Sequence, residues 1–311
     1  VKYYAAHTGR WGGDDKINLQ NLPSRGVHGK KLKRSMIAPP GHSLIEADSA
    51  QIEARVLAWL AEQDNLVEAF TNGEDVYKKM AARIYGKDEA DVTKEERFVG
   101  KTTILGAGYG MGAVKFKDQL KTFGADMELA EARRVINIYR EANYNIGQLW
   151  RNAQQTIVNL SRGDAISFGR NNLLSVDVDR SALRLPSGLL MRYTDLRGDK
   201  IITEFDGIPT ETVEYTYKTR RGRTRIYGGK AIENVCQALA RCIIGEQMLE
   251  ISKRYKVVLT VHDSVVCCVP DEDVAEAQSY IETCMCMVPE WADGLPIDCE
   301  SGVGKSYGDC E

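Results

Sequence analysis

Apolar and polar positions alternate in two different patterns along the chain. The segments 43–48 and 256–270 contain short apolar, β-branched runs, which are typical of buried strands. From 64 to 175 the apolar residues recur at helical spacing between polar connections, so this region is predicted to be mostly helical. The pattern changes to strands from 176 to 228, and a long helix is predicted at 231–251. Together these segments predict an α+β fold with a helical subdomain.

Two acidic residues are predicted at the exposed ends of buried strands. Asp263 follows His262 at the tip of a strand–turn–strand hairpin, and Asp48 ends an earlier strand directly before a helix. A strand end fixes a carboxylate while its tip stays open to solvent, which suits a metal ligand or a general base. For either residue alone, the alternative is a turn Asp that caps its own backbone. The same setting at two distant positions favours the functional interpretation.

Four residues at a spacing of four lie along one predicted helix, namely Arg97, Lys101, Leu105 and Tyr109. With a rise of about 1.5 Å per residue, the series spans roughly 18 Å. That length allows two cations to hold a triphosphate while an apolar and an aromatic side chain meet a sugar and a base. The alternative is an amphipathic helix with a solvated basic edge.

Two short signatures of phosphate binding in this region are incomplete. Residues 100–102 (Gly-Lys-Thr) resemble the end of a P-loop, but Glu95 stands where that loop requires a glycine. The glycine-rich run 106–112 resembles a dinucleotide fingerprint, but Met111 takes the place of its third glycine. We therefore expect neither motif to be functional.

Composition and charge limit the partner and the compartment. The 311 residues are enough for two domains, and a hydrophobic content of 43% with 27% charged residues is ordinary for a globular protein. The net charge of −3 gives no sign of a polyanionic partner. The eight cysteines include no CxxC pair, and the chain shows neither a signal peptide nor an apolar run of membrane length. We therefore expect a cytoplasmic protein with reduced thiols and no membrane contact.

Local charge is more informative than net charge. Two basic clusters could either bind phosphates or form solvated faces. The first comprises Lys30, Lys31, Lys33 and Arg34, and the second comprises Lys218, Arg220, Arg221, Arg223 and Arg225.

Five segments, in order and over nearly the whole chain, resemble the family A DNA polymerases, the bacterial DNA polymerase I group. Residues 48–55 (Asp-Ser-Ala-Gln-Ile-Glu-Ala-Arg) resemble motif A, and 261–264 (Val-His-Asp-Ser) resemble motif C. The four-residue series within 97–110 resembles motif B. Residues 8–10 (Thr-Gly-Arg) and 18–23 (Asn-Leu-Gln-Asn-Leu-Pro) match the primer–template segment of that family.

The resemblance implies a palm with an antiparallel sheet and a largely helical fingers subdomain. The palm would comprise 1–63 and 176–311, the latter with a strand-rich insertion, and the fingers would comprise 64–175. Thumb and 3′–5′ exonuclease have no counterpart, so a second polypeptide or a missing N-terminal region would supply them. Primer–template DNA and dNTPs are the implied partners. The stretch 227–237 looks most like phage and virus members, which implies viral DNA replication in the host cytoplasm.

The resemblance also implies nucleotidyl transfer with two metal ions. Asp48 and Asp263, with Ser49, would hold two Mg²⁺ ions. The ions would lower the pKa of the primer 3′-hydroxyl and neutralise the triphosphate during an in-line displacement. Arg97 and Lys101 would bind the phosphates, and Lys101 would also protonate the pyrophosphate leaving group.

The remaining site residues are assigned by the same resemblance. Glu53 would fill the space that a ribose 2′-hydroxyl needs, and Tyr109 would stack near the template base. Leu105 and Gln51 would complete the nucleotide site. The residues expected to contact DNA are Arg10 and Gln237 in the minor groove, His262 at the primer end, and Asn18, Gln20 and Asn21 along the primer–template segment.

The chain departs from the family pattern at three places. Ser264 stands where Glu is usual, so a third carboxylate ligand is missing there, and we expect activity to survive. Leu105 stands where the family usually has an aromatic residue. Glu233 and Asn234 fall near a position where Asn is usual, which leaves that contact unassigned.

Two other classes of function remain open from the residues alone. A two-metal phosphohydrolase or nuclease would use Asp48 and Asp263 but leave Arg97, Lys101 and Tyr109 without a role. A non-catalytic nucleic-acid-binding subunit would need neither acid. Primer extension with labelled dNTP separates all three.

Overall fold

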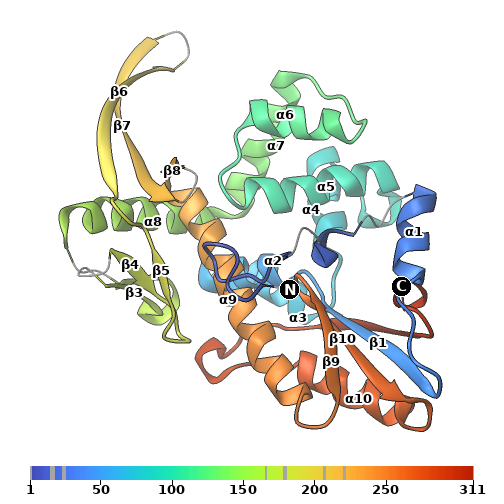
Figure 1. Ribbon diagram of the computed structural model, residues 1–311. Coiled ribbons are helices and arrows are strands. Elements are labelled where there is room, and N and C mark those ends of the chain that lie inside the picture. The colour runs from blue at the N-terminus through green and yellow to red at the C-terminus, as the bar shows by residue number, and fades with distance from the viewer. Residues whose placement is uncertain are drawn as a thin grey trace. The chain divides into compact units, whose positions relative to one another are not determined.

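The computed structural model describes most of the chain. It covers residues 2–14, 18–22, 26–164, 167–177, 181–205, 208–219 and 222–310. The chain forms two compact units, which we call the sheet unit (Val1–Glu53 and Gln237–Glu311) and the helical unit (Ala54–Cys236). The boundaries fall inside helices α2 (Ile52–Leu60) and α9 (Gly228–Ile251), and each unit is described by itself (Figure 1).

A four-stranded antiparallel sheet with strand order β11-β1-β10-β9 is the centre of the sheet unit. Its strands are β1 (His42–Ser49), β9 (Lys256–Val261), β10 (Ser264–Pro270) and β11 (Cys299–Gly304). β9 and β10 form the hairpin that the sequence predicts, with His262 and Asp263 as the two residues between them. The predicted hairpin is therefore confirmed.

One face of this sheet packs on two helices. Ile45, Ala47 and Val265 are fully buried there, in a cluster with apolar side chains of α9 and of α10 (Val274–Met285). Burial of a large aliphatic side chain is worth about 1.5–3 kcal/mol. This cluster therefore holds β1 against β10 and fixes the register between them.

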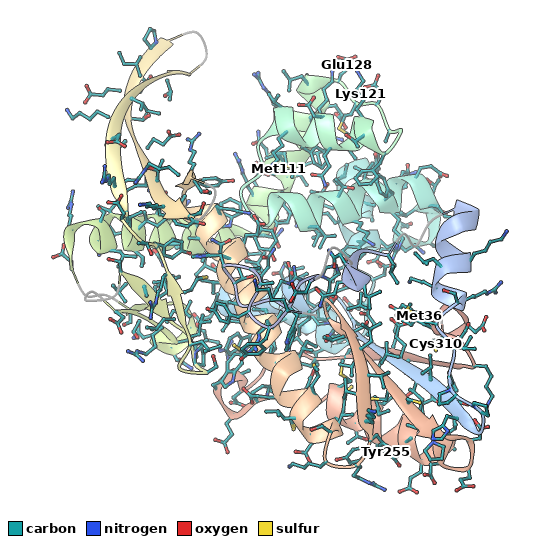
Figure 2. All side chains as sticks on the ribbon, in the orientation of Figure 1. Met36, Met111, Lys121, Glu128, Tyr255 and Cys310 are labelled. Carbon is teal, nitrogen blue, oxygen red and sulfur yellow. The ribbon has the colours of Figure 1, made fainter. Side chains whose placement is uncertain are left out.

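The opposite face of the sheet combines a small apolar cluster with acidic residues. Leu44, Val266 and Cys310 are buried in that cluster, and Cys310 is labelled in Figure 2. Side chains two residues apart in a strand share a face. Glu46 and Asp48 therefore lie on the same side of β1 as Leu44.

Helices α3 to α8 form most of the helical unit (Figure 1). They are α3 (Asp64–Thr71), α4 (Val76–Tyr85), α5 (Lys94–Ala107), α6 (Ala113–Thr122), α7 (Leu129–Ala142) and α8 (Tyr144–Arg162). α5 begins with a capping box, in which Thr93 and Glu96 each bond the other's backbone N–H. Among the described residues, no helix is both long enough and apolar enough to cross a bilayer.

Two small antiparallel sheets complete the helical unit. One consists of β2 (Ser167–Phe168), β3 (Leu174–Asp177), β4 (Ala182–Arg184) and β5 (Leu190–Arg192), and the other of β6 (Arg197–Phe205), β7 (Ile208–Thr219) and β8 (Gly222–Ile226). β6 and β7 form a long ribbon (Figure 1). The α+β class expected from the pattern is confirmed.

The second basic cluster is partly neutralised by acidic residues of neighbouring segments. Arg223 pairs with Asp195 at 2.8 Å, and Arg225 pairs with Glu214 at 2.9 Å. Arg220 and Arg221 lie outside the described residues. The described arginines of this cluster therefore brace β8 against neighbouring segments, which agrees with the interpretation as a solvated face.

The end of α5 differs from the expected helix. The sequence places Arg97 to Tyr109 along one helix, but α5 ends at Ala107, and Tyr109 lies in the turn that follows. Its backbone N–H donates to the Gly106 carbonyl at 3.2 Å, a tightened last turn. Glycines favour such helix ends because they lower the cost of leaving the helix.

Gly100 is predicted to be essential for the packing of α5 on α4. A Cβ at this position would lie 2.1 Å from the Tyr77 carbonyl oxygen. Gly100→Ala should therefore lower the free energy of unfolding by about 1–3 kcal/mol, although alanine normally favours a helix. Gly112→Ala is the matched control, because nothing lies within 4 Å of its Cβ position. Chemical denaturation checks both variants, and equal effects would contradict the packing argument.

Candidate active site

The two predicted acids are brought together by the pairing of β1 with β10. Asp48 lies opposite Ser264 in the register, and Ser264 directly follows Asp263. The Ser49 N–H donates to the Asp263 carbonyl oxygen at 3.1 Å and extends the pairing by one residue. Asp48 at the end of a strand and Asp263 in the hairpin turn therefore face the same space.

A pocket of about 540 Å³ in the sheet unit contains both acids. The residues that line it are Lys33, Glu46, Asp48, Val261, His262, Asp263, Ser264, Glu300, Ser301, Gly302, Tyr307 and Cys310. The pocket thus holds four carboxylates, two from β1, one from β11 and one from the hairpin turn. Such a concentration of acids is unfavourable unless a cation or a proton compensates it.

The pKa values reflect this concentration of negative charge. Asp48 is solvent-exposed, yet the surrounding protein atoms and the charges of Asp263, Glu46 and Glu300 raise its pKa from 3.8 to about 7. Burial raises the pKa of Asp263 as well, while the charge of Arg10 acts in the opposite direction. The site therefore favours binding of positive charge at neutral pH.

Glu46 is held in place by two hydroxyl groups. Ser264 Oγ donates to Glu46 Oε1 at 3.1 Å, and the Tyr307 hydroxyl donates to the same oxygen at 3.2 Å. The buried Lys33 places its Nζ 5.0 Å from the centre of the Tyr307 ring. Sequence reasoning missed Glu46 and Glu300. The two-residue spacing of Glu46 from Asp48 in a strand is the signal that could have found the former.

The available ligands suit a divalent ion whose coordination is completed by other oxygen atoms. Within the described ranges, no group of three or more His, Cys, Asp or Glu side chains is placed to hold a metal ion. Asp48 and Asp263 supply two hard oxygen ligands, and Mg²⁺ is commonly bound through one or two carboxylates plus substrate phosphates and waters. Ser49 is buried, and its Oγ has no hydrogen-bond partner among the described atoms.

Arg10 and Glu53 form an ion pair in the sheet unit. Arg10 Nη2 lies 2.9 Å from Glu53 Oε1, and both side chains are about one quarter exposed. The charge of Arg10 also acts on Asp263 and His262. The pair therefore lies beside the acids and connects the N-terminal segment to the start of α2.

His262 and Gln51 flank the acids in strained backbone conformations. Their φ angles are 56° and 53°. This left-handed region costs a non-glycine residue of order 1–2 kcal/mol. Burial lowers the pKa of His262, and the charge of Arg10 adds to this shift. His262 is therefore neutral at physiological pH.

The predicted DNA-contacting residues differ in their surroundings. Gln20 is buried and its Nε2 donates to the Thr260 carbonyl at 3.3 Å, so it supports β9. Asn18 accepts a hydrogen bond from the Gln20 N–H at 3.2 Å. Gln237 is half-buried on α9. The side chain of Asn21 lies outside the described residues.

Three of the four residues that were predicted to follow one another along a helix lie on one side of α5. Arg97 pairs with Asp75 at 2.6 Å. Burial by itself would raise the pKa of Asp75, but the hydrogen bond and charge of Arg97, together with two backbone N–H donors, lower it. Lys101 is exposed and lies over the Tyr77 ring at 5.7 Å. Leu105 is 39% exposed, which is unusual for an apolar residue inside a helix. The helical unit thus presents two cations and an apolar side chain in one row.

Comparisons with known proteins agree with this arrangement. The family model for DNA polymerase family A matches residues 1–309. The DNA polymerase of Bacillus phage SP02 is 26% identical over 98% of this chain and 51% of its own length. DNA polymerase I of Chloroflexus aurantiacus is 38% identical over 40% of this chain and 13% of its own length.

A solved structure shares the fold. The POL domain of Pol1 from M. smegmatis, in complex with DNA primer-template and dNTP, superposes with a TM-score of 0.69 at 21% identity. The match covers 98% of this chain and 47% of that chain. The present chain therefore spans about half the length of the phage polymerase and of this solved chain.

The raised pKa of Asp48 makes cation binding depend on pH. A carboxyl whose folded pKa exceeds its unfolded pKa loses stability as pH rises, here between about 4 and about 7. Mg²⁺ should therefore raise Tm more at about pH 8 than at about pH 6, because it competes with fewer protons. Scanning calorimetry with and without MgCl₂ at matched ionic strength checks this.

Two variants serve as controls for this effect. Asp48→Asn should be more stable than the wild type above about pH 7 without metal, and should lose most of the Mg²⁺ effect. Asp164→Asn removes an exposed acid of the helical unit and should keep the effect. If the Mg²⁺-induced increase in Tm does not depend on pH, or if it persists in Asp48→Asn, the cation binds elsewhere.

Proposed function

The chain belongs to DNA polymerase family A, and we propose that it is the core of a template-directed DNA polymerase that adds dNTPs to a primer 3′-hydroxyl. The observation that carries this proposal is the convergence of Asp48 and Asp263 in one acidic pocket. Family A DNA polymerases use divalent metal ions, and this pocket has the charge to attract them. The phage relative, which aligns with 98% of the chain, supports a role in viral DNA replication.

Asp48 and Asp263 would hold the metal ions, for which we propose Mg²⁺. When bound, two such ions lower the pKa of the attacking hydroxyl and neutralise charge on the triphosphate. By holding these ions, the two carboxylates would keep the 3′-hydroxyl and the α-phosphate in position. The backbone link from Ser49 to Asp263 keeps both carboxylates in register without relying on side-chain packing.

The exposed side of α5 would bind the triphosphate. Lys101 forms no ion pair within the described part of the chain, so its ammonium can meet the phosphates and donate a proton to pyrophosphate. Arg97 would exchange its carboxylate partner Asp75 for a phosphate, because guanidinium binds both in the same bidentate geometry. Leu105 would contact the sugar, and Tyr109 the base.

The ion pair of Arg10 and Glu53 would select the sugar. A carboxylate held at 2.9 Å by a guanidinium cannot easily turn away from an entering ribose. A 2′-hydroxyl would therefore meet both a filled space and a fixed negative charge. Arg10 keeps further N–H donors, which can reach a minor-groove acceptor of the primer–template.

Neutralising either acid should abolish primer extension. Asp48→Asn and Asp263→Asn keep the side-chain size but remove the charge that holds a metal ion, so extension should slow by more than ~10³-fold. Affinity for primer–template should change little, because duplex affinity depends mainly on phosphate contacts. Asp164→Asn is the control and should extend like the wild type. A loss of only a few-fold from either acid would contradict the assignment, and wild-type cleavage without extension would favour a nuclease.

Glu53 should control discrimination against ribonucleotides. Glu53→Ala opens the space of the carboxylate, so the ratio of kcat/KM for dNTP over rNTP should fall by at least ~10-fold. Glu53→Gln keeps the size but weakens the pairing with Arg10, and should give an intermediate ratio. Glu68→Ala, an exposed acid on α3, is the control. A ratio in Glu53→Ala equal to that of the control would refute the role.

A further inference from the structure

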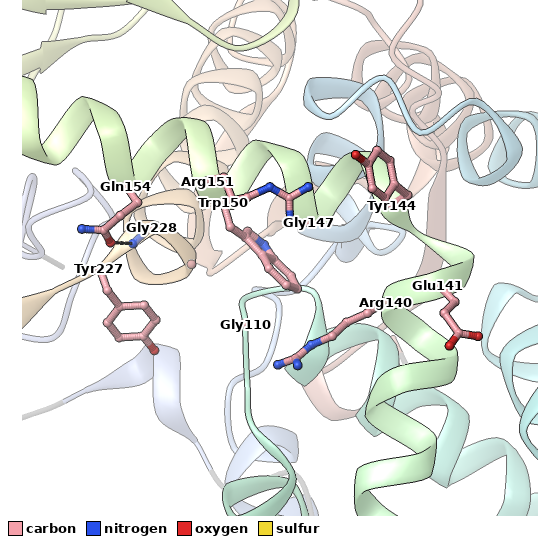
Figure 3. A pocket seen from close by; sticks show the side chains of 11 residues that line it. Gly110, Arg140, Glu141, Tyr144, Gly147, Trp150, Arg151, Gln154, Tyr227 and Gly228 are labelled. Atoms are coloured by element: carbon pink, nitrogen blue, oxygen red, sulfur yellow. Dashed lines mark hydrogen bonds between the residues drawn. The ribbon is translucent and has the colours of Figure 1, made fainter. Parts of the chain in front are cut away.

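Most of the thiols of the chain lie in the sheet unit. In the helical unit, a pocket of about 580 Å³ is lined mainly by arginine, aromatic and glycine residues, and none of its described lining residues is a cysteine (Figure 3). In the sheet unit, by contrast, Cys286 and Cys299 place their Sγ atoms 3.6 Å apart, although 13 residues separate them in the sequence. We call these two residues the thiol pair. The roles given so far do not use it.

The thiol pair is held between the last turn of α10 and the first residue of β11. Cys286 is the C-cap of α10, and its N–H donates to the Glu282 carbonyl oxygen at 3.0 Å. Cys299 begins β11, and its thiol donates to the same carbonyl oxygen at 3.7 Å. Ser301, two residues further along β11, donates to Glu282 Oε1 at 2.5 Å. One residue of α10 thus anchors both members of the pair.

The two thiols differ in their access to solvent. Cys286 is exposed, whereas Cys299 is half-buried and packs against the apolar cluster between the sheet and its helices. Burial raises the pKa of Cys299 to about 12, and the neighbouring sulfur of Cys286 adds to this shift. A dissolved oxidant therefore meets Cys286 first, and Cys299 stays a thiol until its neighbour has reacted.

The thiol pair lies on the opposite side of β11 from the acids. Neighbouring residues of a strand point to opposite faces of the sheet. Cys299 packs on the helix-covered face, whereas Glu300 lines the acidic pocket. In the register, Cys299 lies opposite Ser49, and Glu300 lies opposite Asp48. A covalent bond at Cys299 would therefore hold β11 beside Asp48 without placing a new group in the pocket.

We propose that the thiol pair is a modification site at which a peroxide joins Cys286 to Cys299 in a disulfide. The Cys286 thiolate attacks one peroxide oxygen, the O–O bond breaks, and hydroxide leaves while Cys286 becomes a sulfenic acid. This hydroxide takes up the proton that Cys286 had released. The Cys299 sulfur then attacks the Cys286 sulfur, and the hydroxyl group leaves as water with the Cys299 proton. Two thiols are oxidised, and one hydrogen peroxide is reduced to two waters.

The disulfide would stabilise the edge of the sheet. β11 is an outer strand, and within this sheet it pairs with β1 alone. The two Sγ atoms need to approach by about 1.5 Å to reach bonding distance, which rotation of the exposed Cys286 side chain can supply. The bond would close a loop from α10 to β11 and so lower the entropy of the unfolded chain. We therefore expect a more stable sheet unit with an unaltered acidic pocket, whatever reaction that pocket performs.

Peptide mapping tests the bond directly. The folded chain is reduced, freed of reductant, treated with hydrogen peroxide, blocked with N-ethylmaleimide and digested. The wild type should yield cross-linked peptides that contain Cys286 and Cys299, and dithiothreitol should separate them. If these peptides stay separate, or if the urea-unfolded chain forms the same bond as readily as the folded chain, the proposal is wrong.

Serine variants test the order in which the thiols react. Cys299→Ser leaves Cys286 without a partner, so its sulfenic acid should accumulate and be trapped by dimedone. Cys286→Ser should form no bond and trap little dimedone at Cys299. Cys268→Ser removes a half-buried thiol of β10 outside the pair and should form the bond like the wild type. Equal dimedone labelling of Cys299 in Cys286→Ser and of Cys286 in Cys299→Ser would contradict the order of attack.

Thermal unfolding measures the consequence of the bond. The oxidised wild type should unfold about 5 °C or more above the reduced form. Cys286→Ser and Cys299→Ser should gain no stability from peroxide, and scans in dithiothreitol show whether each variant folds like the wild type. An oxidised wild type that carries the bond but has no higher Tm would overturn the stabilising role.

Primer extension separates this proposal from the polymerase function. The oxidised wild type should keep the rate of the reduced form, because the bond lies on the far side of β11 from the acids. A loss of extension on oxidation that both serine variants escape would contradict that placement. If the reduced chain extends no primer while the mapped bond forms and raises Tm, the polymerase function fails and the modification site stands.

Discussion

The antiparallel pairing of β1 with β10 is the constraint on which the acidic site depends. A shift by one residue would turn every side chain of β1 to the other face of the sheet. In the observed register, Ile45 and Ala47 are buried against α9 and α10, and this burial holds the strand in place. Asp48 then necessarily lies opposite Ser264, next to the hairpin turn that carries Asp263. Apolar packing on one face thus supports repelling charges on the other.

That arrangement leaves the fold with an electrostatic cost that a cation would remove. Desolvation, together with the charges of Asp263, Glu46 and Glu300, raises the pKa of Asp48, so its charged form is disfavoured until a cation binds. Ser264 occupies the place of an acid in the family pattern, and here it donates a hydrogen bond to Glu46. The carboxylate to which Ser264 donates therefore comes from the neighbouring strand and is kept in position by two hydroxyl groups.

Local patterns in the sequence predicted the elements and long-range contacts decided the details. The hairpin around Asp263 and the row from Arg97 to Leu105 could be predicted, because strand and helix periods are local properties. The ion pair of Arg10 with Glu53 could not, because its partners meet only in the folded sheet unit. Gly100, which resembles part of a phosphate loop, instead allows α4 and α5 to touch.

The central claim is that Asp48 and Asp263 act as one unit that holds the ions for nucleotide addition. A double-mutant cycle tests it most directly, with single-nucleotide incorporation measured for Asp48→Asn, Asp263→Asn and the double variant. Groups that share one task are strongly non-additive. The double variant should therefore be no more than a few-fold slower than the slower single variant. Rate losses that multiply would mean that the two acids act independently, and would contradict the shared site.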